Sequence, residues 1–349
     1  SILSGRHSVR SARMRCGRNF FSVALVLILD ASATMQTVEN ADIMGKKVAD
    51  QLVETICRAG IRHIYAVTGD SLNEVNDAVR RAGTVRWVHV RHEESGAFAA
   101  AAESELNGIA CCAGSSGPGH VHLINGLYDA HRSNCPVLAI ASTCPSDQFG
   151  TGYFQETDPI RLFDDCSGYN QMAVTPAQFA RMLPAALQHA IHRREVAVVG
   201  LPGDVAASPC AESPGASGPL PSHGIYRPLD GELRQLAEMI GSAERITVFC
   251  GIGAREAHDE VVRLAAMLKA PVAYTFKAKM EVQYDNPYEI GMTGLLGLPS
   301  AYGAMHESDL LLLLGTDFPY DCFLPSECRI AQVDIRPERI GRRARVELG

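Results

Sequence analysis

The chain has 349 residues, 46% of them hydrophobic, and a net charge of −7. That length predicts about two globular domains, and the acidic balance, with no basic run interleaved with aromatics, argues against nucleic acid as a partner. Eleven cysteines, none in a Cys-x-x-Cys pair, favour buried free thiols in a reducing, cytoplasmic setting over disulfides or a zinc site.

Residues 1–44 do not have the pattern of a folded domain. Arginines precede an apolar run at residues 20–29, and Ala31-Ser32-Ala33 follows it, which is the arrangement of a secretory signal. This run of ten residues is too short to span a bilayer, and the free cysteines argue against export. We therefore expect a disordered leader, or an upstream reading-frame extension before a start at Met35 or Met44.

From Gly45 the sequence alternates helical and strand patterns. Apolar residues recur at helical spacing from Val48 to Ile56 until Gly60 ends the helix, and the apolar stretch 64–67 predicts a strand. Such alternation predicts a parallel sheet with ligands at the carboxyl ends of its strands. Further helices are expected at 72–81 and 98–102, and further strands at 85–90, 109–113, 137–142 and 196–201.

Residues 207–228 are dense in proline, glycine and serine without periodicity, which predicts a linker. The α/β pattern then restarts, so we predict two consecutive three-layer domains with parallel sheets, at 45–206 and 229–349, the second Rossmann-like. The helices expected in the second domain are 231–239 and 256–268, and its expected strands are 246–250, 271–274, 310–314 and 330–335.

The first-domain candidates for chemistry are an acidic segment and a glycine-rich turn. In Arg91-His92-Glu93-Glu94, a carboxylate at a strand end lies where water is scarce, although first-turn acids also simply complement the helix dipole. Three glycines and a proline at 114–119 let a flat ligand come close, or make an ordinary turn. We expect His120 and His122 to be turn or interface residues rather than metal ligands.

The second-domain candidates are glycines and an acid near strand ends. Gly251-Ile252-Gly253 follows one strand, but Glu256 stands where the dinucleotide fingerprint needs its third glycine. Residues 291–297 are a glycine-rich loop with no strand or helix pattern of its own. Asp334 could accept hydrogen bonds from ribose hydroxyls, or be a solvated acid that ends a strand.

Taken in order, these segments resemble the thiamine-diphosphate-dependent enzymes, most closely the pyruvate:quinone oxidoreductases, which include the pyruvate oxidases and the ubiquinone-type pyruvate dehydrogenases. The resemblance covers residues 45–349: the first domain matches a pyrimidine-binding domain, and the second an FAD-binding middle domain. Many motifs in the right order are more specific than any one of them. They are the segments 67–73, 91–94, 115–120, 122–130, 152–156, 201–205, 284–288, 291–297, 314–320 and 332–335.

The resemblance implies a role for each matched residue. Glu93 would bind the N1′ nitrogen of the thiamine aminopyrimidine and stabilise the tautomer that removes the proton from thiazolium C2. Asn125 and Phe154 would border the active site. The pyrimidine pocket would be lined by Ser115, Ser116, Gly117 and Gly119. FAD would be held by Thr293, Gly294, Leu295, Leu296, Thr316 and Asp334, with Gly251, Gly253 and Lys277 as weaker candidates.

The implied reaction is oxidative decarboxylation of pyruvate to acetate and CO₂, with electrons passing through FAD to a quinone. The implied protein is a homo-oligomer, a tetramer in this family, that shares each thiamine between chains and meets the inner membrane face through a tail. Mg²⁺ would need a Gly-Asp-Gly motif and a downstream Asn, but the sequence has no Gly-Asp-Gly. We therefore expect the metal ligands on a diphosphate-binding domain after Gly349, and we expect the chain alone to hold thiamine diphosphate poorly.

Two alternatives stay open. A sister enzyme, an acetolactate synthase or another 2-oxo acid decarboxylase, would share Glu93 and the middle domain, although segments 152–156 and 285–288 favour the oxidase. The other alternative is an inactive fragment that folds and binds FAD only. The sequence leaves the electron acceptor, quinone or oxygen, undecided.

Overall fold

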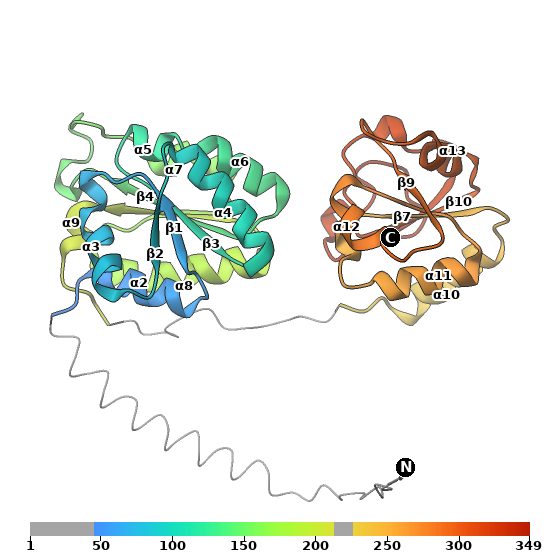
Figure 1. The fold of residues 1–349 in the computed structure, drawn as a ribbon, viewed down its shortest axis with the longest axis horizontal. Helices are drawn as coiled ribbons and strands as arrows, with labels where there is room; N and C mark the ends of the chain where they lie inside the picture. Colours follow the sequence, from blue (N-terminus) through green and yellow to red (C-terminus); the bar gives the residue numbers. More distant parts are fainter. Residues whose placement is uncertain (1–44, 213–225) are drawn as a thin grey trace, which may run out of the picture. The chain divides into compact units, whose positions relative to one another are not determined.

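The computed structural model describes residues 45–212 and 226–349 (Figure 1). The chain divides into two compact units, with the boundary between residues 222 and 223. The leader expected at 1–44 lies outside the described residues. Within the two described ranges, no helix is long and apolar enough to cross a membrane.

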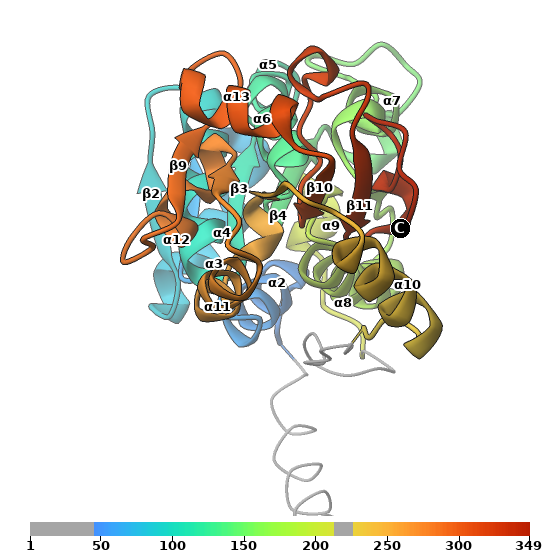
Figure 2. The same cartoon turned by 90° about the vertical axis from the view of Figure 1, so that its right-hand side faces the viewer.

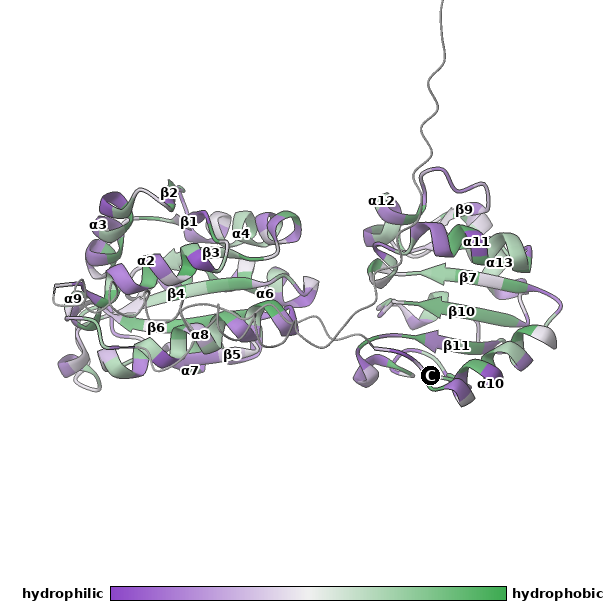
Figure 3. Ribbon diagram, turned by 90° about the horizontal axis from the view of Figure 1, so that it is seen from below, coloured by the Kyte–Doolittle hydropathy of each residue, from purple (hydrophilic) through white to green (hydrophobic). Residues whose placement is uncertain are grey.

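The first unit is built on a six-stranded sheet in the order β2-β1-β3-β4-β6-β5, and neighbouring strands are parallel. Its central strands β4 and β6 are buried along their whole length, as expected for a parallel sheet covered on both faces, and both are largely hydrophobic in Figure 3. The strands are β1 His63–Ala66, β2 Arg86–His89, β3 Ala110–Gly114, β4 Val137–Thr143, β5 Tyr169–Met172 and β6 Val196–Pro202.

Helices cover both faces of this sheet, which makes three layers. On one face, α2, α3, α8 and α9 enclose an apolar core that includes Leu52 and Phe179. On the other face, α4 and α6 enclose a second core that includes Ala97, Leu127 and Phe163. The helices are α2 Val48–Arg58, α3 Asn73–Ala82, α4 Glu93–Asn107, α5 Pro118–Val121, α6 Ile124–Ser133, α7 Pro159–Leu162, α8 Pro176–Arg193 and α9 Gly203–Ala207.

The second unit is built on a five-stranded parallel sheet in the order β11-β10-β7-β8-β9. Figure 2 shows α10 and α11 on one face, where Met239 and Ala265 enter the core, and α13 on the other, where Ala301 and Met305 do so. The strands are β7 Ile246–Cys250, β8 Val272–Tyr274, β9 Glu289–Met292, β10 Leu310–Leu314 and β11 Arg329–Val333. The helices are α10 Asp230–Gly241, α11 His258–Leu268, α12 Lys279–Val282 and α13 Pro299–Glu307.

Two three-layer α/β units with parallel sheets confirm the predicted fold class. The pattern does not predict β5, a mostly half-buried edge strand whose residues include Asn170 and Gln171. It also fails at β9, because Gly291 and Met292 belong to that strand and not to a loop without secondary structure. Short edge strands of mixed polarity lack the apolar run that marks a buried strand.

The first residues of the predicted linker still pack on the first unit. α9 ends at Ala207, Pro209 pairs with Lys47 in an isolated bridge, and the Cys210 N–H donates to the Lys46 carbonyl at 2.8 Å. Residues 213–225 lie outside the described residues, so the predicted domain boundaries stay a prediction.

Candidate active site

Glu93 is the first residue of α4, shortly after β2. His92 caps the helix, because its Nδ1 accepts a hydrogen bond from the Glu94 N–H at 3.3 Å. Glu93 is only 6% exposed, whereas its neighbours Arg91 and His92 are exposed. The start of α4 therefore turns one carboxylate away from water, in the place that the sequence singles out.

Small residues let α4 approach its neighbours closely enough to bury Glu93. A Cβ on Gly96 would lie 3.1 Å from the Tyr65 carbonyl oxygen of β1. A Cβ on Gly126 of α6 would lie 2.5 Å from the Ala97 Cβ, closer than two carbon atoms can pack. The position of α4 between β1 and α6 thus depends on residues with little or no side chain.

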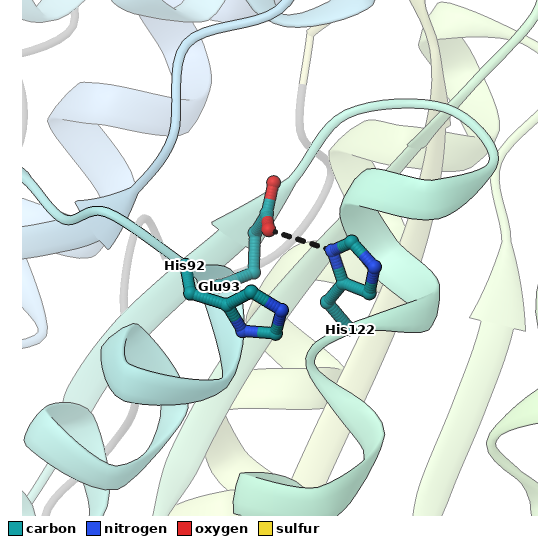
Figure 4. Close-up of side chains that lie close together, drawn as sticks. All are labelled: His92, Glu93 and His122. Carbon is teal, nitrogen blue, oxygen red and sulfur yellow. Dashed lines mark hydrogen bonds and ion pairs between the residues drawn. The ribbon is translucent and has the colours of Figure 1, made fainter.

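The two carboxylate oxygens of Glu93 face different neighbours. Oε2 lies 3.1 Å from His122 Nδ1 (Figure 4), and the His122 ring stacks on His92 with centroids 4.4 Å apart. Oε1 lies beside Gly119, 3.4 Å from where a Cβ would sit. This acceptor oxygen therefore lies against the glycine-rich turn, where Ser115 Oγ also approaches Gly119.

The predicted pyrimidine-pocket residues follow β3 at the carboxyl edge of the sheet: Ser115, Ser116, Gly117 and Gly119. Gly117 has φ +64°, and a Cβ there would lie 2.7 Å from Gln155 Cβ. A Cβ on Gly119 would lie 2.4 Å from Ser115 Oγ. The buried Ser116 hydroxyl donates to Gln155 Oε1 at 3.2 Å. The structure thus brings this turn together with Glu93 through Gly119, and with Gln155, which the sequence analysis did not single out.

The other two predicted active-site residues lie at the edge of this cluster. Asn125 donates its side-chain amide to Glu94 Oε1 at 2.5 Å, so it contacts the neighbour of Glu93 and not Glu93 itself. Phe154 is 75% exposed and precedes Gln155 in the chain.

The loop that carries Phe154 is held by one acid. The Glu156 carboxylate accepts hydrogen bonds from the backbone N–H groups of Gly150, Gly152 and Tyr153 at 2.5, 2.8 and 3.0 Å. The bond from the Gly150 N–H, with those from Tyr153 and Gly152, lowers the pKa of Glu156. The backbone around Phe154 therefore has a defined course although the side chain itself is exposed.

The two histidines of the His-x-His pair, His120 and His122, make different contacts. His120 is fully buried, its Nδ1 donates to the Ser142 carbonyl at 2.8 Å, and burial lowers its pKa. His120 therefore lies in the interior of the first unit, within α5. His122 instead points at Glu93, a role the sequence analysis missed; its place just after the short helix α5, which follows Gly117, was the available signal.

In the second unit, the predicted glycines make a backbone contact between two strand ends. Gly251 and Gly253 follow β7, and Gly315 and Thr316 follow β10. A Cβ on Gly251 would lie 2.3 Å from the Gly315 carbonyl oxygen, to which the Gly253 N–H donates at 2.9 Å. Gly251 and Gly253 are therefore required by the fold itself, whatever they do for a ligand.

Two threonine hydroxyls of the second unit are buried without a partner. Thr293 Oγ1 and Thr316 Oγ1 make no hydrogen bond among the described residues, although both side chains are buried. A buried hydroxyl without a partner is costly, and a bound ligand is one way to satisfy it. Both atoms belong to residues that the sequence analysis assigns to FAD.

The remaining predicted FAD residues differ in exposure. Gly294, with φ +111°, lies against the Phe318 ring, and Leu295 and Leu296 after it are 71% and 70% exposed. Asp334 follows β11 and accepts the Arg336 N–H at 2.9 Å. Lys277 is exposed on a short turn of 3₁₀-helix after β8. No contact joins Lys277 to the unpaired threonines among the contacts of the described part of the chain.

Comparison with known protein families gives two matches, one in each unit. Residues 46–162 match the family described as the N-terminal TPP binding domain of thiamine pyrophosphate enzymes. Residues 233–349 match the family described as their central domain.

Individual relatives give the same picture. An uncharacterized 42.6 kDa protein in the isoamylase 3′ region of Pseudomonas amyloderamosa is 50% identical over 87% of this chain and 77% of its own. The putative thiamine pyrophosphate-containing protein YdaP of Bacillus subtilis (strain 168) is 36% identical over 88% of this chain and 54% of its own length. The pyruvate oxidase of Lactiplantibacillus plantarum is 32% identical over 83% of this chain and 49% of its own length. An acetolactate synthase of Arabidopsis thaliana is 30% identical over 85% and 46%. The chain thus spans about half the length of the relatives whose names state a cofactor or reaction.

Proposed function

Because the chain belongs to the thiamine-pyrophosphate enzyme family, we propose that it carries the pyrimidine-binding and FAD-binding parts of a pyruvate oxidoreductase. This enzyme decarboxylates pyruvate to acetate and CO₂ and passes the electrons to a quinone. The observation that carries the proposal is Glu93, a buried carboxylate at the start of α4 with one oxygen beside the side-chain-free Gly119.

The residues around Glu93 fit the pyrimidine ring of thiamine diphosphate, which when bound supplies the electron sink for cleaving the bond to the carboxyl group of pyruvate. The glycine-rich turn runs beside Glu93 Oε1, so this oxygen lies next to backbone and to Ser115. A water-poor carboxylate makes a stronger hydrogen bond to a ring nitrogen than an exposed one. His122, 3.1 Å from Oε2, fixes the other oxygen, so Oε1 is presented in one orientation.

The loop that contains residues 150–156 supports a role in substrate binding. Gln155 links it to Ser116 of the glycine-rich turn, and the exposed Phe154 offers an apolar cover that would exclude water from a small 2-oxo acid. Asn125, held by Glu94, would border the same space.

The second unit fits FAD through the unpaired hydroxyls of Thr293 and Thr316. Three arginines gather beside Thr316 around Asp317: Arg339, Arg342 and Arg343 lie 3.7, 3.2 and 3.7 Å from its carboxylate. A guanidinium cluster with buried hydroxyl groups suits a phosphate-bearing cofactor. Gly294 to Leu296, Asp334 and Lys277 would complete this site.

Magnesium does not fit the clustered ligands of this chain. In the described ranges, one cluster brings together three side chains that could bind a metal ion: His92, Glu93 and His122. Two of these are histidines, whereas Mg²⁺ prefers oxygen ligands. The Mg²⁺ that anchors a diphosphate would therefore need ligands from elsewhere in the protein. The proposed enzyme works as a homo-oligomer in which each thiamine lies between two chains.

The acetolactate synthases among the relatives support a second candidate, in which a second 2-oxo acid replaces the flavin as acceptor. The two candidates share Glu93 and differ in what happens to the flavin.

The test is anaerobic addition of pyruvate to the full-length protein, purified and supplied with thiamine diphosphate, Mg²⁺ and FAD. We expect the flavin absorption to bleach and acetate to form. Glu93→Gln should slow this by roughly 10²–10⁴-fold, the usual worth of a positioned acid–base group, while FAD binding is kept. Glu238→Gln, an exposed acid on α10, serves as the control. Acetolactate with an oxidised flavin would favour the synthase, and bound FAD with neither product would mean an inactive fragment.

A further inference from the structure

A cavity of about 500 Å³ lies at the amino edge of the first unit's sheet. Its wall comes from the starts of β1 and β2 and from the end of α3, which lie side by side in Figure 1. Glu93 and Ser115 follow the carboxyl ends of β2 and β3, so the length of a four-residue strand, about 13 Å, separates the two regions. Cavities of this size bind small molecules in other proteins.

The wall of the cavity is cationic. Arg62, Arg80 and Arg86 line it, and none of the lining residues is an aspartate or a glutamate. Asp77 matches the charge of Arg80, because its Oδ1 accepts hydrogen bonds from Arg80 Nε and Nη2 at 3.0 and 2.7 Å. The Arg86 guanidinium makes no hydrogen bond or ion pair within the described ranges. The end of α3 contributes only about half a negative charge, so the guanidiniums of Arg62 and Arg86 outweigh it.

Two of the donors in the wall are held in place by the fold. Arg62 Nη1 donates to the carbonyl oxygens of Cys57 and Ile61 at 2.7 and 3.1 Å, which leaves its other nitrogens for a ligand. His63 Nδ1 lies 2.7 Å from Oε1 of Glu103, whose side chain is only 10% exposed. This carboxylate orients the ring, so Nε2 is the atom left to donate to an anion when the imidazole is charged. Donors fixed in advance lose little side-chain entropy when they bind a ligand.

The cavity also has an uncharged part. The half-buried Trp87 lines it, and Gly83 at the end of α3 contributes backbone without a side chain. A Cβ on Gly83 would meet nothing within 4 Å, so the space beside this glycine is open. A phosphate ion alone would fill only a small part of about 500 Å³. The wall therefore suits a molecule that joins an anionic group to an organic one.

We propose that this cavity binds a small phosphate monoester, with the phosphate on Arg62 and Arg86 and the organic group against Trp87. The planar fork of a guanidinium matches two phosphate oxygens at once, which favours phosphate over a less highly charged anion. None of the residues assigned to thiamine diphosphate or to FAD lines the cavity. The site is therefore separate from the candidate active site, and the proposal does not depend on the proposed function.

The experiment is titration of the purified 349-residue chain with phenyl phosphate, followed by the fluorescence of Trp87, the single tryptophan of the chain. We expect a saturable change with one phenyl phosphate per chain, weaker binding of inorganic phosphate, and little binding of phenol, which lacks the charge. Arg86→Gln should weaken the binding of phenyl phosphate by roughly tenfold or more, because hydrogen bonds to charged groups are the strong ones. Arg86→Lys keeps the charge but not the fork, so its affinity should be intermediate.

The matched control is Arg161→Gln on α7 of the same unit, which removes an arginine whose side chain is 90% exposed and should leave binding unchanged. Circular dichroism establishes that each variant is folded, and calorimetry detects binding that does not alter the fluorescence. The proposal is wrong if neither fluorescence nor calorimetry shows saturable binding to the wild type. It is also wrong if Arg86→Gln binds phenyl phosphate as tightly as the wild type, or if phenol binds as tightly as phenyl phosphate.

Discussion

Replacement of Gly126 by alanine tests how α4 is held in place. The added Cβ would lie 2.5 Å from Ala97 Cβ, 2.9 Å from the Glu94 carbonyl oxygen and 3.0 Å from the Phe98 nitrogen. Carbon atoms pack at about 3.5–4.0 Å, so α4 and α6 must separate by roughly 1 Å. We expect this overpacking to lower the free energy of unfolding by about 1–3 kcal/mol, partly offset by roughly 0.5–1 kcal/mol from the better helix propensity of alanine.

Trp87 makes this measurement specific to the first unit, because it is the single tryptophan of the chain and lies on β2. Urea unfolding followed by its fluorescence should show a lower midpoint for Gly126→Ala. Adding Ala97→Gly removes the 2.5 Å contact and should recover part of the loss. Gly203→Ala, whose Cβ would meet nothing closer than 3.4 Å, is the control. An unchanged midpoint for Gly126→Ala would refute the close packing of α4 on α6.

Three further predictions follow from single groups. Thr316→Val replaces an unpaired buried hydroxyl, so it should leave the melting temperature unchanged or higher without FAD, and should weaken FAD binding about three- to tenfold in a titration. Burial lowers the pKa of His120 below 6.5. The stability that neutral His120 contributes is therefore present above pH 6.5 and is lost as the pH falls from 6.5 through the lowered pKa. The urea midpoints of wild type and His120→Asn should therefore become more alike as the pH is lowered through this range. Burial raises the pKa of Cys112 and Cys250 to about 12, so a thiol reagent should label the exposed Cys322 in the folded chain and these two only on unfolding. Peptide mapping that finds Cys112 or Cys250 labelled as early as Cys322 would contradict this.

The fold was predictable where apolar sequence and burial coincide. β7 and β10 have the bounds that their apolar runs predict, because both are interior strands of a sheet covered on two faces. α4 is much longer than its alanine-rich part suggests, since it begins at Glu93, a residue whose burial comes from the packing of other elements. Local pattern carries no information about such burial.

The candidate site was predictable in its parts and less so in its contacts. The position of Glu93 at the start of a helix follows from the sequence, but its contact with His122 depends on how α5 folds back over β3. The unpaired hydroxyls of Thr293 and Thr316 could not be foreseen, because an unsatisfied atom is a property of its whole surroundings. Whether the assigned residues act as proposed is a matter for the experiments above.

The contact between Gly251, Gly253 and Gly315 determines what kind of surface the second unit offers at the ends of β7 and β10. There the peptide backbones of the two strand ends touch directly, with no side chain between them, and this contact sets their spacing. This backbone is already fixed before a ligand binds. Binding of a ligand to it would therefore cost the protein little conformational entropy. A single methyl group at any of these three glycines would push the strand ends apart and remove that rigidity.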